Sequence, residues 1–270
     1  MSCCCYRLQI GEPAGADFRR IVEEQIDEAI AQLQRARASR RKRVHEARKA
    51  IKKTRSALRL IHPAISTEAY DAATAVLREV AQTLAPLRDA DVLRDTAAAL
   101  LHKSKPNARR SPTAKTSLPP LAEPLVELKA SLQAWPWTEV AAATVAQAFA
   151  QTVRRFSKAF HTATAANEKQ DDELFHDWRK RAKDLRYQCL LLEPLWPALF
   201  KAYADSAEKL EDQLGQDHDL AVLRQHHPSL AAEASQRQQH LRHSAQKLGK
   251  RLSAEDPKAW KKRIAAWFHL

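Results

Sequence analysis

Glycine is scarce in this sequence of 270 residues: only four are present, at positions 11, 15, 215 and 249. Loops that cradle phosphates or dinucleotides need clustered glycines after a strand, and no such cluster occurs. Runs of β-branched residues are also rare. Ala, Leu, Arg, Lys, Glu and Gln dominate instead, which is typical of helical proteins. The sequence therefore argues against P-loop and Rossmann proteins and predicts an all-α fold.

Long apolar runs are absent as well. No stretch of about 18 apolar residues occurs, so no membrane span is expected, and residues 1–18 lack the apolar core of a signal peptide. Cys3, Cys4 and Cys5 are adjacent and Cys189 stands alone, a pattern that predicts no disulfide framework. These features predict a cytoplasmic protein without membrane contact. They leave the oligomeric state open.

Positive charge, in contrast, is abundant. The chain has 45 Lys and Arg residues against 32 Asp and Glu residues, a formal net charge of +13. Such a charge raises the local concentration of anions and increases their encounter rate. The candidate partners are nucleic acid, an anionic membrane surface and an inorganic polyanion.

A row of basic residues runs along the segment 44–61. Its spacing of three, four, three and four residues places it in a wedge of roughly 80° on a helix. Like charges at this spacing destabilise an isolated helix by about 0.2–0.5 kcal/mol per pair. A solvated helix face would explain one such row. We call it the first basic row: His45, Arg48, Lys52, Arg55 and Arg59.

The row occurs twice. When position 45 is aligned with position 176, the second basic row is His176, Arg179, Lys183 and Arg186, and the neighbouring Lys49 and Lys180 also match. Only Arg59 lacks a basic counterpart, since Leu190 stands there. A second match pairs residues 84–93 with 214–223 and Asp89 with Asp219. We predict that Pro86 and Gly215 break helices, and that Asp89 and Asp219 cap helices, hold the basic rows through ion pairs, or both.

The sequence thus predicts an internal duplication within a single domain, residues 1–270. The first helical repeat spans 15–103, a flexible linker 104–120, and the second repeat with a C-terminal helical extension 121–270. Helices are expected near 17–36, 39–62, 66–84, 89–102, 121–134, 138–166, 171–193, 196–213, 219–226, 229–254 and from 257 onward. Trp260, Ile264 and Trp267 are expected to pack the last helix onto the others.

The paired H-x-x-R-x-x-x-K-x-x-R helices and the L-x-x-x-R/H-D-x-x-V-L segments resemble the CHAD (conserved histidine α-helical domain) family over roughly residues 15–270. The resemblance implies two four-helix bundles related by a pseudo-twofold axis. It also implies a basic central groove that binds inorganic polyphosphate, and association with polyphosphate granules. Both basic rows would then contact the ligand. To these we add Lys49, Lys180, Arg154 and Lys158, with Asp89 and Asp219 as supporting residues. No catalytic group, metal or cofactor is expected.

Three alternatives remain open. Nucleic acid shares the electrostatics, but the rows hold no aromatic residue on which bases could stack. A metal could be held by His45, His176, Asp89, Asp91, Asp217, His218 and Asp219, although the nearby cations oppose it. A metal-dependent phosphohydrolase would need a carboxylate-held metal or an activated nucleophile, and neither is evident.

Polyphosphate would explain the repulsion within each row, because the counter-charge is then the ligand. The clustered cations should lower the pKa of His45 and His176. Binding of a polyanion should then take up protons, with an affinity that rises as the pH falls from about 8 to 6.

Overall fold

The computed structural model describes residues 6–35, 38–86, 96, 117–165 and 172–268, and within these ranges the regular elements are all helical. This confirms the all-α prediction. The predicted helix 89–102, most of the predicted linker, and Cys3, Cys4 and Cys5 lie outside the described residues. The α-helices are α1 (Ala14–Gln34), α2 (Arg40–Ile61), α3 (Thr67–Thr83), α5 (Glu123–Ser131), α6 (Ala142–Ala165), α7 (Asp172–Leu192), α8 (Pro197–His226), α9 (Ala231–Leu252) and α10 (Pro257–Trp267).

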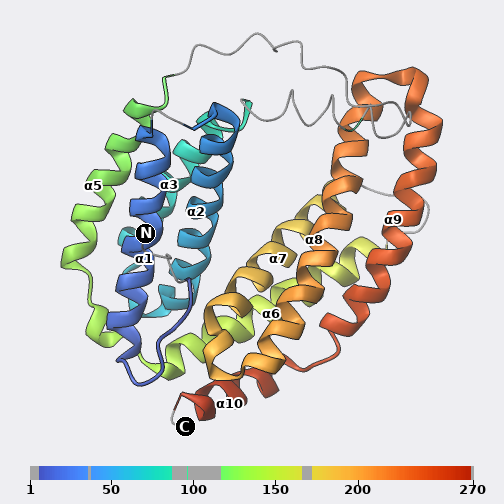
Figure 1. Ribbon diagram of the computed structural model, residues 1–270. Coiled ribbons are helices and arrows are strands. Elements are labelled where there is room, and N and C mark those ends of the chain that lie inside the picture. Colours follow the sequence, from blue (N-terminus) through green and yellow to red (C-terminus); the bar gives the residue numbers. More distant parts are fainter. Residues whose placement is uncertain (1–5, 36–37, 87–95, 97–116, 166–171, 269–270) are drawn as a thin grey trace.

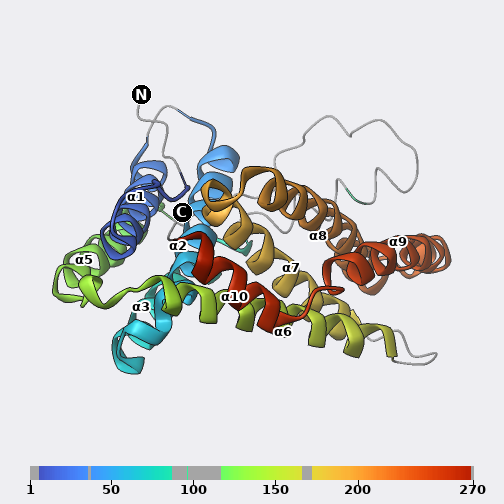
Figure 2. The same ribbon diagram turned by 90° about the horizontal axis from the view of Figure 1, so that it is seen from below.

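The helices form two groups (Figures 1 and 2). One contains α1, α2, α3 and α5, in which α1 packs along α2 and α5 packs against α1 and α3. The other contains α6 to α10, in which α7 and α8 pack along each other and α9 packs along α8. The groups meet where α2 packs against α6 and α7. Although the sequence assigns α5 to the second repeat, in space it packs with the helices of the first.

Several helix ends follow directly from capping residues. The Ser39 hydroxyl accepts a hydrogen bond from the Lys42 amide at 3.4 Å, and the Ser66 hydroxyl accepts one from the Ala69 amide at 3.2 Å. These caps confirm the predicted starts of the second and third helices. The first helix starts earlier than the predicted residue 17: α1 begins after Pro13, and Asp17 does not cap it, since the buried Asp17 carboxylate accepts a hydrogen bond from the Gln9 amide.

Helix α8 runs without a break for 30 residues, through Gly215. The predicted break between 213 and 219 is therefore wrong. One glycine weakens a helix interior by only about 1 kcal/mol, and packing of α8 between α7 and α9 outweighs that cost. What glycine provides here is space. A Cβ atom at position 215 would lie 3.2 Å from the Nη2 atom of Arg179 on α7.

The C-terminal helix packs as predicted. Trp260 and Ile264 of α10 are buried and Trp267 is half-buried. The Trp260 ring lies edge-on to Phe149 of α6, with the centroids 5.2 Å apart. This apolar contact fixes α10 across the end of the second group (Figure 2).

The segment 6–8, which we call the N-terminal strap, joins the two groups. The Tyr6 hydroxyl donates to the Lys53 carbonyl oxygen of α2 at 3.0 Å, and its ring lies edge-on to Tyr187 of α7. The Leu8 amide donates to the Leu191 carbonyl oxygen of α7 at 3.0 Å. Tyr6 and Leu8 are both buried, so the strap extends the core between α2 and α7.

Candidate functional site

The first basic row lies along α2, next to the face that this helix buries. Val44, Ala47, Ile51, Leu58 and Ile61 are buried and hold the helix in the core. The row therefore borders the packed side of the helix. Four members of the row are half-buried: Arg48, Lys52, Arg55 and Arg59. His45 is exposed, and so is the neighbouring Lys49.

Neighbouring helices orient the arginines of this row. The Arg48 guanidinium donates to the Ala81 carbonyl oxygen of α3 at 2.7 Å. Burial, followed by the charge of Arg59, lowers the pKa of Arg55 below its ordinary value. Arg59 forms an ion pair with Asp184 of α7. The far end of the row thus reaches the second helix group.

The second basic row lies along α7 and faces α8. The Arg186 guanidinium pairs with Glu208 and, at 3.0 Å, with Glu211 of α8. The Lys183 ammonium lies 3.7 Å from a Glu211 carboxylate oxygen. Arg179 lies against Gly215, which leaves space for its guanidinium. The α8 surface therefore shapes and partly neutralises this row.

These ion pairs correct one expectation. The sequence suggested that the counter-charge of each row is a ligand, yet Asp184, Glu208 and Glu211 supply part of it within the protein. These carboxylates were missed because the sequence does not show which faces of two helices oppose each other. Glu208 and Glu211 are three residues apart on one face of α8, but only the packing of α7 on α8 directs that face at the row.

The two matched histidines have different surroundings. The His45 side chain is 56% exposed, and its Nε2 atom lies 4.0 Å from a Glu46 carboxylate oxygen. His176 is half-buried and its ring contacts that of His218 of α8 at a tilt of 31°, with the ring centroids 4.4 Å apart. Burial, together with His218 and the nearby cations, lowers the pKa of His176 to about 4. The predicted direction is right for His176, but burial, and not the nearby cations, is the largest cause of the lowered pKa.

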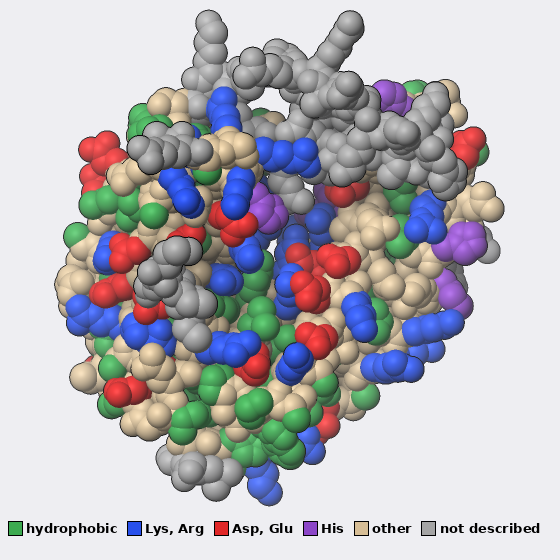
Figure 3. Space-filling view, viewed as in Figure 1, with side chains coloured by type: hydrophobic (Ala, Val, Ile, Leu, Met, Phe, Trp, Pro, Cys, Tyr) green, Lys and Arg blue, Asp and Glu red, His purple; other side chains and the backbone are tan. Residues whose placement is uncertain are grey.

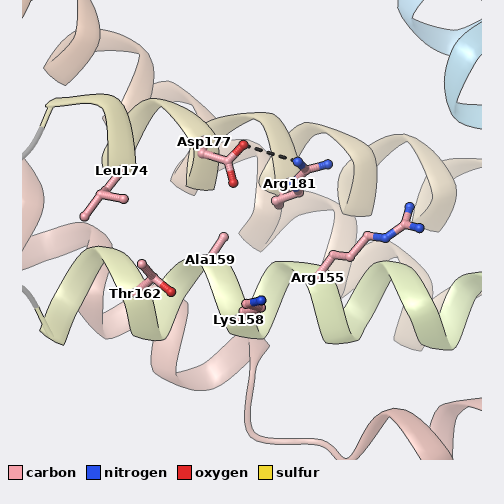
Figure 4. Close-up of a pocket in the computed structure, with 7 residues that line it drawn as sticks. All are labelled: Arg155, Lys158, Ala159, Thr162, Leu174, Asp177 and Arg181. Atoms are coloured by element: carbon pink, nitrogen blue, oxygen red, sulfur yellow. Dashed lines mark hydrogen bonds and ion pairs between the residues drawn. The ribbon is translucent and has the colours of Figure 1, made fainter.

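Arg154 and Lys158 are exposed on α6. Lys158 lines a pocket between α6 and α7 together with Asp177 and Arg181 of α7, and the lining includes no member of the second basic row (Figure 4). Lys158, which was expected to bind the ligand together with the rows, therefore faces a side of α7 that does not carry the second basic row.

The structure bears on one of the two supporting residues. Asp89 lies outside the described residues. Asp219 lies half-buried inside the continuous α8 and therefore does not cap a helix, while Asp217, two residues earlier, forms an ion pair. The Asp217 carboxylate, 2% exposed, pairs with Arg242 of α9 at 2.6 Å. Arg242 also pairs with Asp172 of α7 at 2.5 Å, so this buried network joins three helices.

The surface is hollowed between the two helix groups (Figure 3). Lys and Arg side chains gather within this hollow and along its sides, with acidic side chains beside them. The α2 and α7 helices touch through polar groups: the Ser56 hydroxyl donates to the Asp184 carbonyl oxygen and Gln188 donates to the Ser56 carbonyl oxygen, each at 3.4 Å. Figure 1 shows the two helices diverging from this contact toward their N-terminal ends.

Two further observations bear on the alternatives. In the part of the chain that the structure describes, no three His, Cys, Asp or Glu residues are grouped as a metal site would require. None of the described helices is long and apolar enough to cross a membrane.

Comparison with known proteins agrees with the all-α fold. The chain is similar in structure to the crystal structure of the CHAD domain from the plant Ricinus communis, with a TM-score of 0.55 and 19% sequence identity. The match covers 97% of this chain and 94% of that one, and it concerns the fold alone. A comparison with curated proteins gave no match. The family pattern of the CHAD domain matches residues 20–228, more than half of the chain. The chain therefore belongs to the CHAD domain family.

Proposed function

We propose that this protein binds inorganic polyphosphate along the two basic rows, in the hollow between the helix groups, and does not hydrolyse it. The observation that carries the proposal is the repetition of the basic row on α2 and α7, two helices that pack against each other. Membership of the CHAD family, which is associated with polyphosphate binding in general, supports it. We further propose that the protein associates with polyphosphate granules in the cell.

The chemistry of the rows suits this ligand. Polyphosphate carries negative charge on every phosphoryl unit and has no base to read. Guanidinium groups bind phosphate oxygens through two parallel hydrogen bonds, while lysines act as point charges. Glu208 and Glu211 would hold the side chains of Arg186 and Lys183 in place before the anion arrives, at the expense of some affinity.

The test is a calorimetric titration with long-chain polyphosphate. Replacement of Arg48 and Arg179 by Gln should lower the affinity at least about tenfold, since each substitution removes a charged hydrogen-bond donor. The helical circular dichroism should stay unchanged. The matched control is Lys261→Gln/Lys262→Gln, which removes two exposed charges on α10. Equal affinity in the two double variants would refute the proposal.

Three further measurements separate the alternatives. Polyphosphate should displace RNA of matched charge, and the reverse result would indicate a nucleic-acid-binding protein. Release of phosphate from polyphosphate, measured with and without Mg²⁺, should stay at the background level. In cells, a fluorescent fusion should coincide with polyphosphate granules, and the Arg48→Gln/Arg179→Gln variant should not.

A further inference from the structure

A second basic region lies outside the two rows, in the pocket between α6 and α7. Its volume is about 450 Å³, within the range of small-ligand sites. Arg155 and Lys158 come from α6 on one side, and Arg181 comes from α7 on the other (Figure 4). The Thr162 hydroxyl adds a polar group, and Asp177 is the acidic residue of the lining. Cations from two helices therefore converge on one cavity.

The charge of this pocket is unbalanced. Arg181 is the cation that the carboxylates engage: its guanidinium lies 3.2 Å from Asp177 and 3.9 Å from Asp184. Among the described residues, neither Arg155 nor Lys158 forms an ion pair, and both are exposed. One carboxylate thus faces three cations within the pocket, which leaves two positive charges without a counter-charge in the lining.

Asp184, which lies near Arg181 of the pocket lining, has further cationic neighbours. Asp184 interacts electrostatically with four guanidinium groups from three helices: Arg55 and Arg59 of α2, Arg155 of α6 and Arg181 of α7. One carboxylate cannot neutralise four cations. Arg155 and Arg181 belong to both the pocket and this cluster, so the cluster adds one carboxylate, Asp184, and two further cations, Arg55 and Arg59. The field stays positive and favours a compact anion with several charges over a single carboxylate.

We propose that this pocket binds a short oligophosphate of about three phosphoryl groups, through lining side chains that belong to neither basic row. The Arg155 and Arg181 guanidinium groups can each bind two phosphate oxygens from opposite sides, and Lys158 adds a point charge. The lining contains no aromatic side chain on which a base could stack. The ligand is therefore the phosphate chain itself, with no nucleoside required.

The experiment is a calorimetric titration with inorganic tripolyphosphate. Arg155→Gln/Lys158→Gln should bind it about tenfold or more weakly than the wild type, because two charged donors are lost. Both residues are exposed, so the fold should be retained, as circular dichroism would show. The control Lys261→Gln/Lys262→Gln removes the same charge from α10 and should keep the wild-type affinity. No binding to the wild type, or equal affinities in the two double variants, would overturn the proposal.

Two further arms define the ligand. ATP should bind no more tightly than tripolyphosphate; a clear preference for ATP would overturn the proposal in favour of a nucleotide site. Long-chain polyphosphate should lose most of its affinity in Arg48→Gln/Arg179→Gln, which should still bind tripolyphosphate like the wild type. If long-chain binding fails altogether while tripolyphosphate binding still depends on Arg155 and Lys158, the proposed function is wrong and the pocket proposal stands.

Discussion

Removal of the carboxylates that face the second basic row should strengthen polyphosphate binding. Glu208 and Glu211 of α8 pair with Arg186, and Glu211 also lies 3.7 Å from the Lys183 ammonium. Any phosphate bound to these cations must approach the same carboxylates. The double variant Glu208→Gln/Glu211→Gln keeps the size of both side chains and removes both negative charges.

The size of the effect follows from Coulomb's law. A carboxylate about 6 Å from a phosphate charge repels it by about 0.7 kcal/mol in water and about 2.8 kcal/mol at an effective dielectric constant of 20. The Glu211 side chain is 14% exposed, so its repulsion lies nearer the higher value. The Glu208 side chain is 47% exposed, so its repulsion lies nearer the value in water. We expect about 1–2 kcal/mol of added binding free energy for the pair, or about a tenfold rise in affinity. The lost ion pairs should lower the unfolding free energy by about 1 kcal/mol.

The assay is a titration with long-chain polyphosphate at several salt concentrations. The control Glu123→Gln/Glu127→Gln removes two exposed carboxylates from α5 and gives the same change in net charge. It should change the affinity much less than the α8 variant. If the two variants bind equally, the effect is only one of net charge. The carboxyl-terminal half of the second row would then not lie in the ligand site.

Three other perturbations have outcomes fixed by the structure. Asp217→Asn should lower the unfolding free energy in urea by about 3 kcal/mol, since it removes the carboxylate that pairs with the 3%-exposed Arg242; a change below about 1 kcal/mol would show that this pair contributes little. Gly249→Ala should lower the unfolding free energy by about 1–2 kcal/mol in the same assay, because the added Cβ would lie 2.6 Å from the Trp178 ring. An unchanged unfolding free energy would mean that the neighbouring side chains move aside without cost. Because the pKa of His176 is lowered to about 4, the unfolded state binds more protons between about pH 4 and 6.5, so stability should fall as the pH falls through this range. His176→Gln should flatten that slope, and an unchanged slope would assign it to other groups.

Much of the architecture could be predicted from local signals. Ser39 and Ser66 are capping residues before amphipathic segments, and both helices start where these residues predict. The continuity of α8 could not be predicted, because a glycine such as Gly215 usually indicates a helix break. In the folded protein Gly215 instead leaves space for the Arg179 guanidinium. That role depends on a residue 36 positions away in the sequence, and only the packed structure brings the two together.

The candidate site, too, could be predicted only in part. Spacing alone places the basic residues on one side of each helix, because the helical period fixes that geometry. The partners of these residues depend on helix–helix packing, which periodicity does not encode. Asp184 shows this: it lies off the second row, yet Arg59 of the other helix group pairs with it. Lys158 shows the converse, since it has suitable spacing on α6 but faces the pocket with Arg181.

The N-terminal strap has a consequence for how the protein unfolds. Tyr6 belongs to the beginning of the chain, yet its hydroxyl is bonded to α2 and its ring lies against Tyr187 of α7. If either helix group opened, the strap would lose a buried partner and expose apolar surface. The two groups therefore share part of their folding free energy. We expect them to melt in a single cooperative transition, although their sequences look like two repeats.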